Sequence, residues 1–214
     1  MIDSELIKNI KSGLGNVSRE TLDELNTFTH SILEKNKVIN LISSSTEKSI
    51  NTRHIIDSAQ IIDFIDKKSI SVCTDLGSGG GFPGIVIAIL MKARKPLFKV
   101  IFYEKSYHKS NFLKDMSKKF KLNTEIHQKN IFKQKNLQTD IIVSRAFKPL
   151  PIIFEIASTN FKKFKYIILF LGKSGKEILK DASRKWKFDY EERKSLTNVD
   201  SLIIKISNLK KKNG

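Results

Sequence analysis

The sequence predicts an α/β protein with a mostly parallel sheet. From Ser69 onward, short runs rich in Ile, Val and Phe alternate with longer segments of helical periodicity, the pattern of strands joined by covering helices. Before that point only helical patterns occur, so we expect a helical extension at residues 1–67 and the sheet domain at 68–214. A length of 214 residues with 40 % apolar content suits one ordinary domain with a small appendage.

Apolar residues at helical spacing mark the extension. A short first stripe consists of Leu6, Ile7 and Ile10. After the candidate N-cap Ser18, a second stripe consists of Leu22, Leu25, Phe28, Ile32 and Leu33. Ser44-x-x-Glu47 has the form of a capping box and predicts a third helix. The apolar face of that helix consists of Ile50, Ile55, Ala59, Ile62 and Ile65.

Seven strands are expected in the sheet domain. Five lie at residues 70–74, 97–103, 124–128, 140–143 and 166–171, and a terminal pair lies around 185–193 and 201–206. Helices are expected at 85–91 and 106–120. The single cysteine, Cys73, falls in the first strand, so we expect a buried packing residue that forms no internal disulfide.

The turn after the first strand reads Asp75-Leu76-Gly77-Ser78-Gly79-Gly80-Gly81-Phe82-Pro83-Gly84. Glycines allow positive φ and let a ligand lie on the main chain at a helix N-terminus. The spacing also satisfies a dinucleotide fingerprint, but an acid just ahead of the first glycine would repel a pyrophosphate. S-adenosylmethionine (SAM) has no phosphate and carries an ammonium and a sulfonium, so Asp75, Gly77 and Gly79 favour SAM. A purely structural tight turn is the alternative.

Later strand ends supply further candidate cofactor contacts. Glu104 ends the second strand, where an acid can accept hydrogen bonds from both ribose hydroxyls. Ile131 and Phe132 follow the third strand, where they could sandwich an adenine or could equally be core plugs. Ser144-Arg145-Ala146-Phe147 ends the fourth strand, at the edge nearest a transferable methyl group. Together these positions predict a Rossmann-like SAM-dependent methyltransferase fold with a seven-stranded sheet.

A formal net charge of +17 suggests a polyanionic partner such as nucleic acid. Only six of the 39 basic residues are arginine, however, and a low-GC coding bias would also produce a lysine-rich chain. No stretch approaches the roughly 18 apolar residues of a membrane span, and the first residues lack a signal-peptide core. We therefore expect a cytoplasmic protein without membrane association.

Four separated motifs resemble the RsmG (GidB) methyltransferases. They are Glu34-x-Asn36-Lys37-x-x-Asn40-Leu41, Arg53-His54-Ile55-Ile56-Asp57-Ser58, the glycine turn beginning at Asp75, and Ser144-Arg145-Ala146-Phe147. The resemblance runs through nearly the whole chain. It implies a bacterial cytoplasmic enzyme that uses SAM to methylate N7 of a guanine in the 530 loop of 16S ribosomal RNA.

The same resemblance implies roles for individual residues. It implies SAM contacts at Gly77, Phe82, the Ile131-Phe132 pair and Arg145. Arg53, His54 and Asp57, which by spacing alone are as compatible with a surface cluster and a packed histidine, become residues of the active face or of a structural signature. We take Arg53, His54 and Lys173 as candidate substrate contacts, expect no metal, and expect a monomer that acts on 16S ribosomal RNA or the small ribosomal subunit.

The residues after the fourth strand also bear on the reaction. Amine methylation usually employs an Asn/Asp-Pro-Pro-aromatic turn there, and pyrimidine C5 methylation needs a thiolate, for which Cys73 lies on the wrong strand. Guanine N7 has an in-plane lone pair and no proton, so alignment could suffice. Arg145 is then the candidate catalytic residue, which could hold SAM or contact guanine O6. The alternatives are methylation of another RNA position or a small molecule, and a non-catalytic basic RNA-binding protein.

Overall fold

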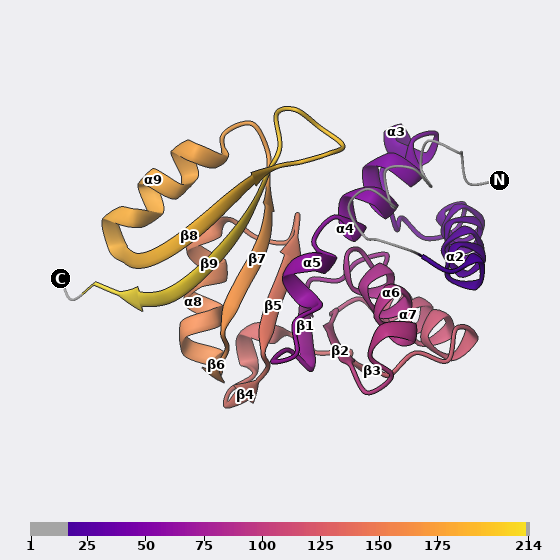
Figure 1. Ribbon diagram of the computed structural model, residues 1–214, viewed down its shortest axis with the longest axis horizontal. Coiled ribbons are helices and arrows are strands. Elements are labelled where there is room, and N and C mark those ends of the chain that lie inside the picture. Colours follow the sequence, from indigo (N-terminus) through magenta and orange to yellow (C-terminus); the bar gives the residue numbers. More distant parts are fainter. Residues whose placement is uncertain (1–16, 213–214) are drawn as a thin grey trace.

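The computed structural model describes residues 17–212 (Figure 1). The predicted stripe of Leu6, Ile7 and Ile10 lies outside the described residues. Helices flank a central sheet on both of its faces, and the helices of the N-terminal segment (residues 17–67) lie together beside α6 (Gly84–Arg94) and α7 (Tyr107–Lys119). Within the described part of the chain, no helix is long and apolar enough to cross a membrane.

The central sheet has seven strands in the order β3-β2-β1-β5-β7-β9-β8. Neighbouring strands are parallel from β3 to β7, whereas β9 runs antiparallel to both of its neighbours. The strands are β1 (Val72–Leu76), β2 (Lys99–Tyr103), β3 (Thr124–His127), β5 (Ile141–Arg145), β7 (Tyr166–Leu171), β8 (Trp186–Lys194) and β9 (Leu202–Lys211). A separate parallel pair consists of β4 (Leu137–Gln138) and β6 (Phe161–Lys163). The predicted mostly parallel seven-stranded fold is confirmed.

Strand order places a crevice at the carboxyl ends of the central strands β1 and β5. The chain passes from β1 outward to β2 and β3 and then returns across β1 to β5. At such a switch point the connections leave the carboxyl ends of β1 and β5 in opposite directions, and ligands of open α/β sheets bind in the gap.

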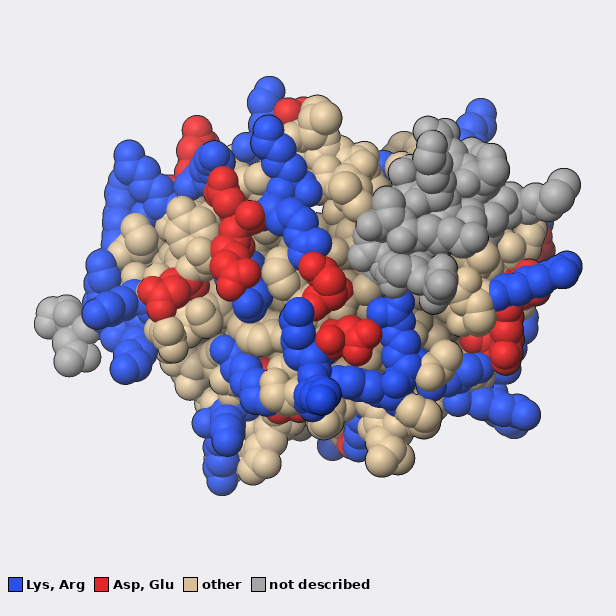
Figure 2. Space-filling model, in the orientation of Figure 1, with Lys and Arg blue, Asp and Glu red and all other residues tan. Residues whose placement is uncertain are grey.

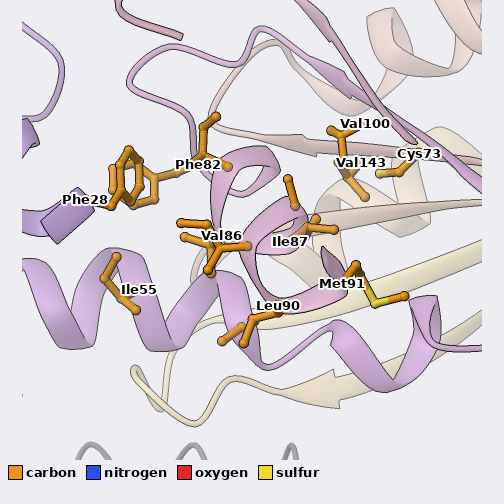
Figure 3. Packing of buried hydrophobic residues seen from close by; sticks show 14 of the residues in the cluster. Phe28, Ile55, Cys73, Phe82, Val86, Ile87, Leu90, Met91, Val100 and Val143 are labelled. Atoms are coloured by element: carbon orange, nitrogen blue, oxygen red, sulfur yellow. The ribbon is translucent and has the colours of Figure 1, made fainter. Parts of the chain in front are cut away.

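Side chains alternate between two hydrophobic clusters because strand residues point to opposite faces. Ile141 and Val143 belong to the cluster under α6 (Gly84–Arg94) and α7 (Tyr107–Lys119). Ile142 belongs to the cluster under α8 (Leu150–Asn160) and α9 (Gly175–Lys185). Figure 3 shows the first cluster, in which Cys73 is fully buried among apolar side chains, as expected for a packing residue.

Helix α2 (Arg19–Asn36) begins as predicted, because Ser18 caps it by accepting a hydrogen bond from the Thr21 N–H at 3.2 Å. Its Phe28 is fully buried, with its ring 5.3 Å from that of Phe82 and 6.4 Å from that of Phe112. The N-terminal helices therefore share the hydrophobic cluster of α6 and α7.

Two local predictions in this segment are wrong. Helix α3 (Ser44–Glu47) starts after Ser43, so Ser44 is not its cap, and the Glu47 carboxylate instead accepts a hydrogen bond from Asn36 Nδ2 at 2.6 Å. The predicted third helix is also interrupted. It consists of a π-helix η1 (Asn51–Ile56) followed by the short helices α4 (Asp57–Ala59) and α5 (Ile62–Ile65). A tertiary contact with Asn36 thus overrides the local capping pattern.

Candidate active site

A cavity of about 480 Å³ lies at the switch point of the sheet, within the usual size range of small-molecule sites. Its walls come from the loops after β1, β2, β3 and β5 and from the N-terminal segment. Seven of the eight predicted cofactor residues line it: Gly77, Gly79, Phe82, Glu104, Ile131, Phe132 and Arg145. The fold therefore brings together residues that are up to 68 positions apart in the sequence.

Three glycines of the loop after β1 have positive φ: +70° at Gly77, +54° at Gly79 and +97° at Gly81. A Cβ on Gly77 would lie 2.1 Å from Cδ2 of Phe147, so the aromatic ring lies directly against the loop. A Cβ on Gly79 would meet nothing closer than the Gly77 carbonyl oxygen at 3.9 Å. The backbone of Gly79 thus faces open space in the cavity, and only its φ demands glycine.

Glu104 joins the glycine loop to the end of β2. Its Oε2 accepts a hydrogen bond from the Gly79 N–H at 2.9 Å, and its Oε1 accepts one from the Ser106 N–H at 2.8 Å. The side chain is buried but lines the cavity. Because a carboxylate has about four acceptor positions, each oxygen keeps a lone pair for a further donor such as a ribose hydroxyl.

Short helix η2 (Ile131–Lys133) forms the apolar end of the cavity. The Asn130 side chain accepts a hydrogen bond from the Phe132 N–H at 3.1 Å, and Asn160 Nδ2 donates to the Ile131 carbonyl at 2.6 Å. Ile131 is 3 % exposed and Phe132 is 45 % exposed. Ile131 is therefore both a core residue and a wall of the cavity, whereas Phe132 is free to cover a flat ligand.

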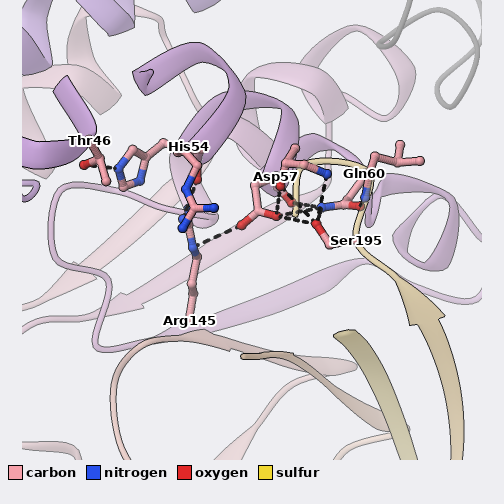
Figure 4. A network of polar contacts seen from close by, with 9 residues as sticks. Thr46, His54, Asp57, Gln60, Arg145 and Ser195 are labelled. Carbon is pink, nitrogen blue, oxygen red and sulfur yellow. Dashed lines mark hydrogen bonds and ion pairs between the residues drawn. The ribbon is translucent and has the colours of Figure 1, made fainter. Parts of the chain in front are cut away.

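Arg145, at the end of β5, points from the sheet edge toward the N-terminal segment (Figure 4). Its Nε lies 3.3 Å from Oδ2 of Asp57, and its Nη2 donates to the carbonyl oxygen of Arg53. No partner within the described residues occupies its buried Nη1. The pKa of Arg145 is lowered, because the effect of burial outweighs that of the Asp57 carboxylate, which raises it. Next in the chain, Ala146 has φ of +51°, a left-handed turn that directs Phe147 back toward the glycine loop.

Asp57 connects Arg145 to the loop between β8 and β9. Its Oδ1 accepts hydrogen bonds from Gln60 Nε2 at 2.8 Å, Thr197 Oγ1 at 2.8 Å and Ser195 Oγ at 3.1 Å. Figure 4 shows this network on the side of Asp57 that faces away from Arg145. Both carboxylate oxygens are thus engaged, which makes Asp57 a positioning residue.

His54 lies beside Arg145 and lines the cavity. Its Nε2 lies 2.9 Å from Thr46 Oγ1, and its ring centroid lies 4.8 Å from that of Phe82. Burial, together with the charges of Arg145 and Arg53, lowers the pKa of His54 to about 4. The imidazole is therefore neutral at physiological pH, and its buried Nδ1 has no partner within the described residues.

Comparison with known proteins decides the family. The family model described as rRNA small subunit methyltransferase G (GidB) matches residues 21–205. The chain belongs to this family. It is 50 % identical over 200 residues to the ribosomal RNA small subunit methyltransferase G of Pelagibacter ubique, covering 92 % of this chain and 93 % of that protein. The protein of the same name from Ruegeria pomeroyi is 34 % identical over 192 residues, covering 90 % of this chain and 93 % of that protein.

Solved structures support the fold. A SAM-dependent methyltransferase from Aquifex aeolicus superposes with a TM-score of 0.56 at 15 % identity, covering 74 % of this chain and 92 % of that chain. The protein is thus a SAM-dependent methyltransferase with the Rossmann-like fold of that class.

The cavity of this family member fits SAM. Gly79 offers an open backbone, Glu104 keeps acceptors for ribose hydroxyls, and η2 supplies an apolar wall for a purine. SAM supplies an electrophilic methyl group on a sulfonium. The residues of the cavity would bind and orient it, and Arg145 lies where β5 ends.

Three predicted site residues do not line the cavity. Asp75 lies within β1, fully buried, and its Oδ2 accepts a hydrogen bond from the Gly84 N–H at 2.9 Å. Burial raises its pKa to about 7. Asp75 therefore supports the glycine loop from behind, and its side chain is not among the residues that line the cavity. Arg53 contributes its backbone carbonyl to Arg145, and Lys173 is exposed after β7, outside the cavity.

Sequence reasoning missed an apolar wall from the N-terminal segment. Asn36 Oδ1 accepts hydrogen bonds from the backbone N–H groups of Leu41 at 2.7 Å and Ile42 at 3.0 Å, which presents both side chains to the cavity. Gly80 packs against this turn, since a Cβ there would lie 3.1 Å from the Leu41 carbonyl oxygen. An apolar pair inside a polar loop, five residues after an asparagine, was the available signal.

Tyr103, Phe147 and four lysines were also missed as cavity residues. Tyr103 had a signal, because it is the last residue of a strand whose carboxyl end points to the crevice. The lysines did not stand out among so many others.

Proposed function

We propose that the protein transfers the methyl group of SAM to N7 of a guanine in the 530 loop of 16S ribosomal RNA. It acts in the cytoplasm, as a monomer, on the RNA or on the small ribosomal subunit. Membership of the family supports an RNA substrate, since its relatives carry the name of a ribosomal RNA methyltransferase. In this proposal residues 1–67 are a helical extension of the methyltransferase domain at 68–214.

One observation carries the choice of N7: among residues 17–212, the side chains at the reaction edge include a cationic donor, Arg145, and no effective base. His54 has a pKa of about 4, far below the value near 7 that suits a general base. The carboxylate of Glu104 is engaged by two backbone N–H groups. A nucleophile that must lose a proton is poorly served by these side chains. Guanine N7 already presents a lone pair and needs only alignment.

Arg145 supplies the means of recognising guanine. In this proposal the guanidinium of Arg145, which lines the cavity, donates to guanine O6 and leaves the neighbouring N7 free. Adenine presents an N6 amine at the corresponding position, so a guanidinium donor would face another donor there. Asp57 and the Arg53 carbonyl hold the guanidinium, which fixes its direction.

The test uses labelled SAM with naked 16S ribosomal RNA and, separately, with small subunits lacking the modification. Methylation at N7 makes the ring cationic, so borohydride reduction and aniline should cleave the strand at one site within the 530 loop. Methylated RNA that resists aniline would place the methyl group on another atom. RNA binding without methyl transfer would identify a non-catalytic RNA-binding protein.

Variants of Arg145 test its role. Arg145→Ala should lose on the order of tenfold or more in rate, about 1.4 kcal/mol or more of transition-state stabilisation. Arg145→Lys should rescue little, because an ammonium cannot reproduce the planar guanidinium fork. Arg184→Ala is the matched control, since Arg184 is exposed on α9 and pairs only with Asp181 among the described residues. Circular dichroism would confirm that each variant is folded, and a folded Arg145→Ala enzyme with normal turnover would refute the role.

A further inference from the structure

Four lysines line the mouth of the SAM cavity: Lys105, Lys109, Lys129 and Lys148. They come from separate segments, after β2, in α7, after β3 and after β5. Lys109 is half-buried and the other three are exposed. Within residues 17–212 none of their ammonium groups forms an ion pair with a carboxylate. We call these four residues the lysine rim.

The lysine rim opposes the cofactor that binds inside it. Among the described residues that line the cavity, these four charges and that of Arg145 face a single carboxylate, that of Glu104. SAM carries an ammonium, a sulfonium and one carboxylate, hence a net positive charge. Like charges around one cavity repel, so the rim alone weakens SAM binding. On the face shown in Figure 2, acidic side chains lie between several of the basic ones.

We propose that the lysine rim binds the phosphates flanking the target nucleotide, and that RNA bound there raises the affinity of the protein for SAM. The inference rests on the proposed RNA substrate. Phosphates next to Lys105, Lys109, Lys129 and Lys148 would neutralise the charges that repel the sulfonium. By linkage the effect is reciprocal, so bound SAM raises RNA affinity by the same factor.

Chemistry of the side chains fits this division of roles. Lysine ammonium groups on flexible stems act as point charges, which suits backbone phosphates at varied geometry. Phosphate contacts position RNA without reading its sequence, whereas a guanidinium fork reads a base edge. The rim thus positions the strand, and Arg145 recognises the guanine.

S-adenosylhomocysteine (SAH) separates charge from shape. It lacks the sulfonium and has no net charge, but otherwise resembles SAM closely. A repulsive rim must therefore act on SAM much more than on SAH. Without RNA, raising the salt concentration should strengthen SAM binding, because screening weakens the repulsion. The same change should weaken RNA binding.

Calorimetry on the full chain tests the proposal. SAM and SAH are titrated at low and high salt, with and without an RNA hairpin that carries 7-deazaguanine at the target position and so cannot be methylated at N7. The rim variant carries Lys105→Gln, Lys109→Gln, Lys129→Gln and Lys148→Gln. Its matched control removes four exposed charges from α9 and β8 by Lys180→Gln, Lys185→Gln, Lys187→Gln and Lys194→Gln.

We take each of the four lysine charges to lie about 10 Å from the net positive charge of SAM, screened at about 0.1 M salt. Their removal should then let the rim variant bind SAM about threefold more tightly without RNA. Its SAH affinity should change by less than about 1.5-fold. Its RNA affinity should fall at least tenfold, with the log–log salt slope smaller by about 3. In the wild type and the control variant, RNA should raise SAM affinity about threefold, and this coupling should vanish in the rim variant.

Two results would overturn the inference. Equal changes in SAM and SAH affinity would show that the rim does not act through charge on the cofactor. An unchanged RNA affinity and salt slope in the rim variant would place the phosphates elsewhere. Neither result depends on methylation, so the aniline assay with unmodified RNA still decides the proposed reaction separately.

Discussion

Asp75 and His54 should shape the pH dependence of stability in opposite senses. Burial raises the pKa of Asp75 from 3.8 to about 7, so between these values the folded protein holds a proton that the unfolded chain has lost. The contribution of Asp75 to the free energy of unfolding is fully present below pH 3.8 and is lost as the pH rises through about 7. Burial and two arginines lower the pKa of His54 from 6.5 to about 4. Its contribution is present above pH 6.5 and is lost as the pH falls through about 4.

The magnitudes follow from these pKa values. For Asp75 the difference corresponds to about 4 kcal/mol of unfolding free energy lost between pH 4 and 8. For His54 it corresponds to about 3 kcal/mol, which solvent screening of a half-buried ring reduces to about 1–2 kcal/mol. In the wild type the two effects oppose each other from pH 4 to 6.5. A variant that lacks one of the two groups should therefore show the pH dependence of stability that the other group causes.

Urea unfolding between pH 5 and 8 measures the effect. Asp75→Asn keeps an oxygen that can accept the Gly84 N–H bond and cannot ionise, so its stability relative to the wild type should rise by about 2–3 kcal/mol from pH 5 to 8. His54→Gln should gain about 1 kcal/mol relative to the wild type as the pH falls from 7.5 to 5. His108→Gln, on the exposed side of α7, controls for loss of an imidazole. A difference for Asp75→Asn that stays constant with pH would show that this carboxyl group is ionised throughout.

Three further experiments probe the cavity and its support. Gly79→Val places a branched side chain at φ of +54° and into open cavity space, so calorimetry should show at least a tenfold loss of SAM affinity. Glu104→Gln should weaken SAM by about 1–2 kcal/mol, and unchanged affinity would place the ribose elsewhere. A double-mutant cycle of Asp57→Asn and Arg145→Met tests the ion pair between these two side chains. At 3.3 Å and an effective dielectric constant of 20, the two charges attract each other by about 5 kcal/mol before the cost of desolvation is subtracted. Urea unfolding of the four proteins should give a coupling free energy of about 1–3 kcal/mol. A coupling free energy below about 0.5 kcal/mol would contradict the positioning role of Asp57.

Sequence patterns sufficed wherever a local signal and the final packing agree. The strand at Tyr166–Leu171 was predicted at both ends, because a continuous apolar run buried on both faces is bounded by Lys165 and Gly172. Ser18 was identified as a cap because, among the described residues, its side chain hydrogen-bonds only to Thr21 of its own helix. The glycine loop and Glu104 were found because parallel strands bring their carboxyl ends to one edge.

Long-range contacts decided the remainder. The Ser44-x-x-Glu47 pattern failed because Asn36 binds Glu47 in the folded chain. The burial of Asp75 depends on pairing of β1 with both β2 and β5, which local spacing does not reveal. The contact of Phe147 with Gly77 joins positions 70 residues apart and depends on the left-handed turn at Ala146, a residue that rarely adopts it.

The position of Arg145 depends on segments from the whole chain. Its guanidinium contacts Asp57 and the Arg53 carbonyl from the N-terminal segment, and Asp57 is held in turn by Ser195 and Thr197 from the loop before β9. The direction of the guanidinium is therefore set only when these segments have packed together. In the proposed site, binding of SAM by the glycine loop would need far fewer of these contacts, because Gly79 and Glu104 are joined directly. It follows that damage to η1 or to the β8–β9 loop should impair methyl transfer more than SAM binding.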